Sequence, residues 1–110
     1  MNIRVTKDGV DDIIFQAEQV EFTGTNIFLK VGDDRIPLIT TNFSVLADDN
    51  NLIRCTMTER SCTRSRIITC EKLMFYGKSG IQVTCSDRPI QHYRVDMLII
   101  KLIPRVTDNI

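Results

Sequence analysis

One segment of this sequence occurs twice, and this repeat restricts the possible folds more than any other feature of the chain. When Ile14–Arg35 is aligned with Ile67–Arg88 without a gap, six positions carry the same residue. Ordinary residue usage would give roughly one match over such a window. The matched pairs are Ile14/Ile67, Glu18/Glu71, Phe22/Phe75, Gly24/Gly77, Asp34/Asp87 and Arg35/Arg88. The sequence therefore predicts an approximate internal duplication.

Both copies have the pattern of a β-hairpin followed by a second chain reversal. In the second copy, the apolar Leu73 and Phe75 precede a glycine-containing link, and an alternating run follows at residues 81–85. Two alternating runs joined by such a link are typical of a hairpin. We expect the buried face to carry Phe22 and Phe75. The residues expected to make the turns are Gly24 and Gly77 at positive φ, then Asp33-Asp34 and Ser86-Asp87.

The remaining chain also alternates, with one ambiguous stretch. Val10–Val20 fits either a helix or a strand, and the β-branched character of the matching residues 66–70 favours a strand. Pro37 indicates an edge strand or the start of a strand, because proline cannot donate to a ladder. The apolar run Met97–Ile103 is predicted to be a central strand buried on both faces.

These patterns predict an all-β fold. We expect a single domain over residues 1–110, a sandwich or jellyroll of about eight short antiparallel strands. Its quasi-repeats are residues 14–35 and 67–88, and residues 105–110 form a loose tail. The chain has 110 residues, which is close to the usual size of one domain.

A finer periodicity of about two dozen residues runs through most of the chain. A small or branched residue, a polar residue and then alternating apolar residues recur at Ala17–Phe22, Thr41–Leu46, Cys70–Phe75 and Val95–Ile100. In this the chain resembles the OstA-like β-jellyroll of lipopolysaccharide-transport proteins. The resemblance consists of hydrophobic alternation and includes no diagnostic motif. It implies a rolled β-fold with a small apolar or lipid-like ligand between its sheets.

Charge and hydropathy exclude several classes of function. The 14 basic and 14 acidic side chains give a formal net charge of zero. A general polyanion binder normally has a basic excess, so the composition argues against non-specific nucleic-acid binding. Little charge repulsion opposes self-association. The N-terminal residues lack the apolar core of a secretory signal, and Met97–Ile103 is too short to span a bilayer. We expect an intracellular (cytoplasmic) or virion protein.

The nucleophilic and metal-binding residue types form no recognisable site. Cys55, Cys62, Cys70 and Cys85 include no Cys-x-x-Cys pair, and His92 lies outside their spacing. A zinc site needs ligands at short spacing, so we expect free thiols, no metal and no cofactor. No nucleophile motif accompanies His92. Turn chemistry explains the acidic pairs at 11–12, 33–34 and 48–49, which lack calcium-loop spacing. We expect a protein that is not an enzyme.

Basic residues cluster around a predicted exposed loop at residues 59–65. The candidates for binding an anion or a partner are Arg54, Arg60, Arg64, Arg66 and Lys72. Guanidinium groups in such a loop match phosphate or carboxylate geometry. An ordinary solvated face is the alternative, because no aromatic residues are interleaved for base stacking.

The leading hypothesis is a non-catalytic structural or assembly module, such as a virion or other particle component, that acts through self-association. The expected partners are further copies or other structural proteins, without small-molecule ligands, nucleic acid or membranes. One alternative is a jellyroll module that binds a small apolar or lipid-like ligand. Another is a weak phosphate or nucleic-acid binder that uses the Arg54–Lys72 segment.

Overall fold

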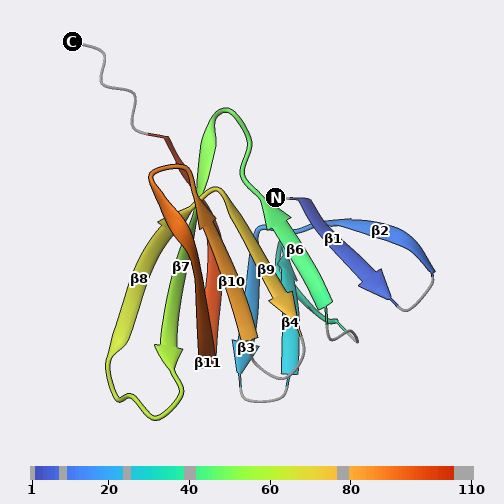
Figure 1. Cartoon of the computed structure of the whole chain (residues 1–110). Coiled ribbons are helices and arrows are strands. Elements are labelled where there is room, and N and C mark those ends of the chain that lie inside the picture. Colours follow the sequence, from blue (N-terminus) through green and yellow to red (C-terminus); the bar gives the residue numbers. More distant parts are fainter. Residues whose placement is uncertain (1, 8–9, 24–25, 39–41, 77–79, 106–110) are drawn as a thin grey trace.

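The alternating sequence forms β-strands through nearly all of the described chain. A computed structural model describes residues 2–7, 10–23, 26–38, 42–76 and 80–105, and within residues 4–15 it describes the backbone. These residues form eleven strands and no helix (Figure 1). The strands are β1 (Asn2–Lys7), β2 (Val10–Gln16), β3 (Gln19–Thr23), β4 (Asn26–Val31), β5 (Asp34–Pro37), β6 (Asn42–Leu46), β7 (Asn51–Glu59), β8 (Ser65–Cys70), β9 (Lys72–Tyr76), β10 (Gly80–Cys85) and β11 (Arg88–Pro104).

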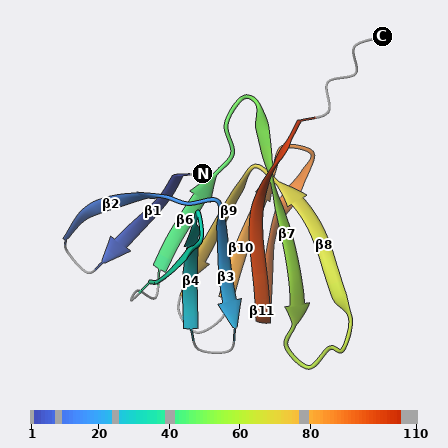
Figure 2. The same cartoon turned by 180° about the vertical axis from the view of Figure 1, so that it is seen from behind.

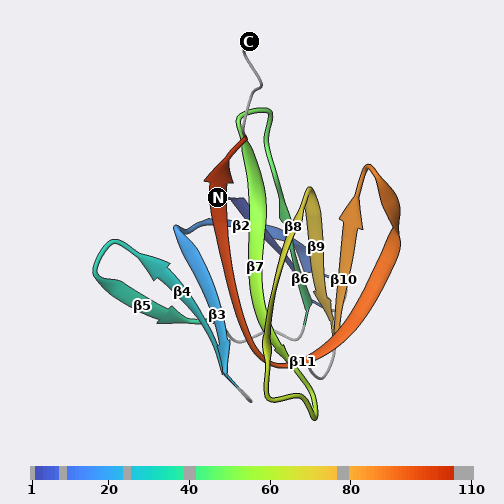
Figure 3. The ribbon, with the colours of Figure 1, turned by 90° about the vertical axis from the view of Figure 1, so that its left-hand side faces the viewer.

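The strands form two antiparallel sheets that share the long strand β11. The first sheet has the order β2-β1-β6-β9-β10-β11, in which β11 contributes residues 88–94. The second has the order β8-β7-β11-β3-β4-β5, in which β11 contributes residues 95–104. Figure 3 shows β11 sweeping from β10 round to β3 and β7, so that the sheets curl into a half-barrel. The register of β11 with β7 shifts between Val95 and Met97, and such a bulge lets a strand bend.

The two sheets repeat one arrangement, as the duplication predicts. The hairpin β3–β4 in one sheet corresponds to β9–β10 in the other, and the pair β1–β2 corresponds to β7–β8. The arrangement extends each copy beyond residues 14–35 and 67–88, so that the first copy also includes β1 and β6 and the second also includes β7 and β11. These extended copies are interlocked, because β6 of the first pairs with β9 of the second, while β11 of the second pairs with β3 of the first. The short links before β3 and before β9 also make equivalent hydrogen bonds. Glu18 N–H donates to Lys30 O at 2.9 Å, and Glu71 N–H donates to Thr84 O at 3.1 Å.

The core lies between the two sheets. Figures 1 and 2 show β3 and β4 on the opposite side of the molecule from β9 and β6. The inward residues come from both sheets, and equivalent positions of the repeats are buried together, such as Val20 with Leu73 and Ala17 with Cys70. At the centre, the rings of Phe22 and Phe75 lie 5.0 Å apart, and Phe43 stacks on Phe75 at 5.1 Å. Alternation therefore predicted the buried face of the repeats correctly.

The strand prediction was correct for the ambiguous segment and for the edge. Residues 10–16 and 19–23 form β2 and β3 rather than a helix. Pro37 ends β5, which pairs with β4 and with no other of the described strands. The described strands number eleven rather than about eight, and short links at 17–18 and 71 interrupt pairing without an obvious turn motif. The predicted strand at 97–103 is part of the longer β11, which begins at Arg88.

The prediction that Met97–Ile103 is buried on both faces was wrong. The segment is central, since β11 pairs with β3 on one side and β7 on the other. Leu98 and Ile100 are fully buried, but Met97 is 40% exposed and Lys101 is exposed. The run is apolar on both faces in sequence, yet only one face of the sheet is covered by another layer.

Polar turns were correctly predicted where the structure describes them. Gly32, at φ 61°, and Asp33 join β4 to β5, while Ser86 and Asp87 join β10 to β11. The Asp48 carboxylate accepts a hydrogen bond from Asn50 N–H at 2.9 Å, which lowers the pKa of Asp48. Gly24 and Gly77 lie outside the described residues, as does the predicted tail beyond residue 105. Arg105 is bound to the loop before β7, because its backbone N–H donates to Asn50 O at 2.9 Å.

Candidate functional site

The five basic candidates are divided among different parts of the surface. Arg60 and Arg64 are exposed in the loop between β7 and β8, and Arg66 is exposed on β8. Arg54 is exposed in the middle of β7, and Lys72 begins β9 in the other sheet, where it is half-buried. The Arg54–Lys72 segment therefore does not form one binding surface.

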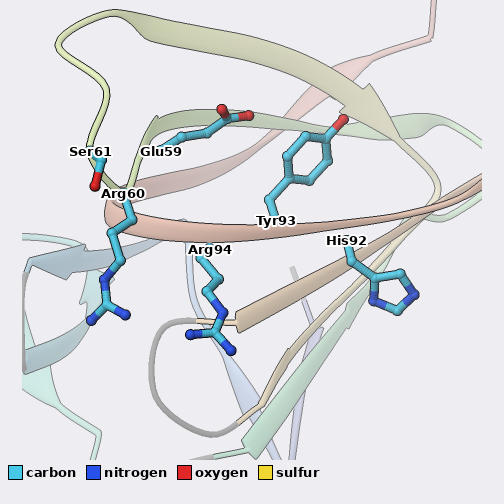
Figure 4. Close-up of a pocket in the computed structure, with 6 residues that line it drawn as sticks. All are labelled: Glu59, Arg60, Ser61, His92, Tyr93 and Arg94. Carbon is cyan, nitrogen blue, oxygen red and sulfur yellow. The ribbon is translucent and has the colours of Figure 1, made fainter.

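Arg60 meets a cation from a distant part of the sequence. Its backbone N–H donates to the carbonyl of Arg94 at 2.9 Å, which fixes the loop against β11. Figure 4 shows the side chains of Arg60 and Arg94 extending in the same direction, with Ser61 beside them. They line an open depression of about 410 Å³, together with His92, Tyr93 and the acidic Glu59. Two neighbouring guanidinium groups provide planar donors that suit a phosphate or a carboxylate.

Arg66 is engaged on the opposite side of β11. Its Nη1 lies 3.4 Å from Oε1 of Glu59, and its guanidinium carbon lies 5.6 Å from the centroid of the Tyr93 ring. Figure 4 places Glu59 and Tyr93 together on that side, away from Arg60 and Arg94. The side chain of Arg66 is 55% exposed, so this ion pair contributes little to stability, but it does compensate the charge of Arg66.

His92 is an exposed residue of a polar strand face. Its Nδ1 is hydrogen bonded to the Tyr76 hydroxyl at 2.9 Å, across the first sheet. The structure places Cys62 elsewhere, with its Sγ 4.0 Å from Oε2 of Glu59. The fold therefore does not place the Cys62 thiol against His92 as a nucleophile and its base would be.

The other cysteines are packed as apolar groups rather than activated. All four cysteines are free thiols, and Cys55 and Cys70 are buried. Burial raises the pKa of Cys55 far above its usual range and raises the pKa of Cys70 to about 12. The pKa of Cys85 is also raised, mainly by burial. Since the thiolate is the reactive form, these three groups are poor nucleophiles at neutral pH.

The acidic side chains that the structure describes do not gather into a metal site. Among the described residues, no group of three or more His, Cys, Asp or Glu side chains could hold a metal ion. The pairs 33–34 and 48–49 lie at the β4–β5 turn and at the loop before β7. The pair 11–12 lies in β2, where the description covers the backbone.

A row of cations crosses the outer face of the second sheet. Arg54 on β7 is the cross-strand partner of Lys101 on β11, which is also the partner of Gln19 on β3. Gln19 pairs with Lys30 on β4, and Lys30 with Arg35 on β5. All four cations are exposed. The sequence analysis identified only Arg54.

The sequence gives only a partial signal for Lys30, Lys101 and Arg94, which the sequence analysis did not identify as candidates. Alternation within β4 and β11 indicates that Lys30 and Lys101 point outward, opposite to the buried positions. Nothing local indicates that these strands are neighbours, or that Arg94 lies beside Arg60. Those contacts depend on pairings between the two repeats.

Comparisons with protein-family models, with curated proteins and with solved structures found no match to this chain. The resemblance to the OstA-like jellyroll therefore has no support beyond the shared alternation.

No helix of the described residues is long and apolar enough to cross a membrane.

Proposed function

We propose that this protein is a non-catalytic structural or assembly module that acts by self-association through an open edge of its second sheet. The observation that supports this proposal is the position of β8. It pairs with β7 on one side, and among the described strands no other pairs with it. An unpaired strand presents N–H and C=O groups that another chain can complete.

The side chains of β8 fit this role. Ile67 is 66% exposed, and β8 contains no proline that would remove a donor from the edge. One acceptor of the strand is engaged, since the Cys85 thiol donates to Thr69 O at 3.3 Å. The opposite end of the sheet, β5, is shorter and ends in Pro37, which makes it the poorer template. Pairing at β8 would remove Ile67 from water.

Size-exclusion chromatography with light scattering tests this proposal. We expect an oligomer for the natural chain and a shift towards monomer for Ile67→Lys, because an edge lysine opposes strand addition. Met97→Lys is the matched control: Met97 is also exposed on the outer face, but β11 is paired on both sides. A natural chain that stays monomeric at high concentration would contradict self-association, and an equal effect of both variants would contradict the β8 edge.

A particle component, such as a virion protein, is the more specific form of this proposal. Its support is the small size and β-rich fold of the chain together with the open edge. An edge that pairs with a different edge gives open filaments or rings, whereas an edge that pairs with itself gives a closed dimer. Negative-stain electron microscopy of the concentrated protein distinguishes these outcomes.

Binding of a small anion is a second candidate, supported by the parallel side chains of Arg60 and Arg94. Titration with inorganic phosphate, followed by amide chemical shifts, tests it. We expect shifts around residues 60–61 and 92–94 that disappear in Arg60→Ala plus Arg94→Ala. Arg64→Ala serves as the control, because Arg64 does not line the depression. Phosphate shifts that are unchanged in the double variant would exclude this site.

The alternative of an apolar ligand between the sheets has less support. The contacting rings of Phe22, Phe75 and Phe43 occupy the centre of the space that such a ligand would need.

A further inference from the structure

The cation row on the outer face of the second sheet joins five neighbouring strands. We use "cation row" for Arg54, Lys101, Lys30 and Arg35, with Gln19 between the two pairs. At about 4.8 Å between strands, these five residues span roughly 19 Å. Three of the cations, Arg54, Lys101 and Lys30, make no ion pair with the described residues, whereas Arg35 contacts Glu21 at 2.8 Å.

This arrangement places like charges opposite each other. Arg54 and Lys101 are directly opposite each other, and so are Lys30 and Arg35. Like charges directly opposite on adjacent strands are destabilising. Glu21 compensates Arg35, whereas Arg54 and Lys101 make no ion pair with the described acids. A bound polyanion would relieve the repulsion between Arg54 and Lys101.

The acidic residues that balance the overall charge lie mainly away from this face. Turns and loops hold Asp33, Asp48, Asp49 and Asp87, and Asp34 is the first residue of β5. A chain with zero net charge can therefore carry one basic face. The composition alone suggested that an anionic partner is unfavourable, but the basic face removes that objection.

A mainly apolar row runs beside the cation row. The adjoining cross-strand row, which we call the apolar row, holds Ile67, Thr56, Ile99, Glu21, Phe28 and Pro37, so that four of its six members are apolar. At one end, the guanidinium of Arg35 lies over the Phe28 ring, 4.5 Å from its centroid. An arginine stacked in this way offers a planar surface on which a base can stack. The face thus combines a line of positive charge with a parallel row in which apolar side chains predominate.

We propose that this face binds single-stranded nucleic acid, with phosphates along the cation row and bases against the apolar row. A single strand carries its charges along one side and its flat apolar groups along the other, which matches the two rows. An anionic membrane fits less well, because Ile99 and Phe28 are half-buried in the sheet and do not protrude to enter a bilayer. This interaction differs from pairing at the β8 edge, since it uses side chains of the face rather than backbone groups of β8, and Ile67 is the residue that the two surfaces share.

Fluorescence anisotropy with a labelled single strand of about 15 nucleotides tests the proposal, since site sizes for such folds are roughly 4–16 nucleotides. Four contacted phosphates predict a slope of about −3 for the logarithm of affinity against the logarithm of salt concentration. Arg54→Gln plus Lys101→Gln removes two contacts and is expected to reduce the slope to about −1.4. The same variant is expected to melt no lower than the natural chain, because it relieves a like-charge pair.

Arg64→Gln plus Lys72→Gln is the matched control, since it removes the same charge at positions outside the row. The control is expected to keep the slope and affinity of the natural chain. Absence of binding at low salt would overturn the proposal, as would an equal loss in both variants. Vesicles of phosphatidylserine and phosphatidylcholine complete the test: binding to them that depends on Arg54 and Lys101, without oligonucleotide binding, would assign the face to membranes instead.

Discussion

Phe22 and Phe75 occupy the same position in the two repeats, and their rings touch, with centroids 5.0 Å apart and planes tilted by 56°. Contact between equivalent residues indicates that an approximate two-fold axis of the duplication passes between them. The strand exchange around this contact ties the repeats together, because each sheet contains three strand segments from each copy. The two repeats thus complete a single core, and neither has a sheet of its own.

Removal of one central ring is expected to destabilise the whole chain. Phe75 is 2% exposed and contacts both Phe22 and Phe43, so Phe75→Ala should lower the free energy of unfolding by about 3–5 kcal/mol. Chemical denaturation provides the measurement. Tyr76→Ala is the control, since Tyr76 is the next residue along β9 and is 37% exposed. A Phe75 variant as stable as the Tyr76 variant would contradict this core.

The buried thiol of Cys70 is expected to make stability fall at high pH. Its pKa rises from 9.0 to about 12 on folding, mainly because burial disfavours the thiolate. Between these values the Cys70 thiol keeps its proton in the folded state and loses it in the unfolded chain. The contribution of Cys70 to the free energy of unfolding is therefore complete below pH 9 and is lost as pH rises towards 12. Denaturation of the natural chain and of Cys70→Val between these limits measures it. The variant should show the shallower decline, and Cys62→Ser should match the natural chain.

Thiol labelling is expected to separate the cysteines by exposure. Cys62 is exposed in the β7–β8 loop, whereas Cys55 and Cys70 are buried. A thiol reagent at neutral pH should modify Cys62 rapidly and should reach the buried pair only when the chain unfolds. Mass spectrometry of samples taken over time gives the order in which the cysteines are labelled. Early labelling of Cys55 or Cys70 would show that the half-barrel opens readily.

The Asp48 turn is expected to need a side-chain acceptor rather than a charge. The Asp48 carboxylate accepts hydrogen bonds from Asn50 N–H and from the Asn51 amide, at 2.9 and 3.0 Å. Asp48→Ala should lower the melting temperature, whereas Asp48→Asn keeps an acceptor and should lower it less. These bonds lower the pKa of Asp48, so its contribution is present above its unfolded pKa and is lost as pH falls through the folded value. The difference in melting temperature between the natural chain and Asp48→Asn should therefore shrink in acid.

The sequence alone determined the strands, the described turns and the buried face of each repeat. These properties depend on residues close together in the chain: alternation gives the face, as at Phe22 and Phe75, and short polar side chains such as Asp48 close turns on their own backbone. The outward position of Lys101 follows from the same alternation, although the apolar run around it suggested burial on both faces.

Only the tertiary structure decided which strands are neighbours. The pairing of β6 with β9 and of β11 with β3 exchanges strands between the repeats, and hydrophobic alternation is the same for any such pairing. For that reason the sequence could not place Arg94 beside Arg60, or align Arg54, Lys101, Lys30 and Arg35. Side chains from distant segments become a surface only when backbone hydrogen bonds fix the order and register of their strands.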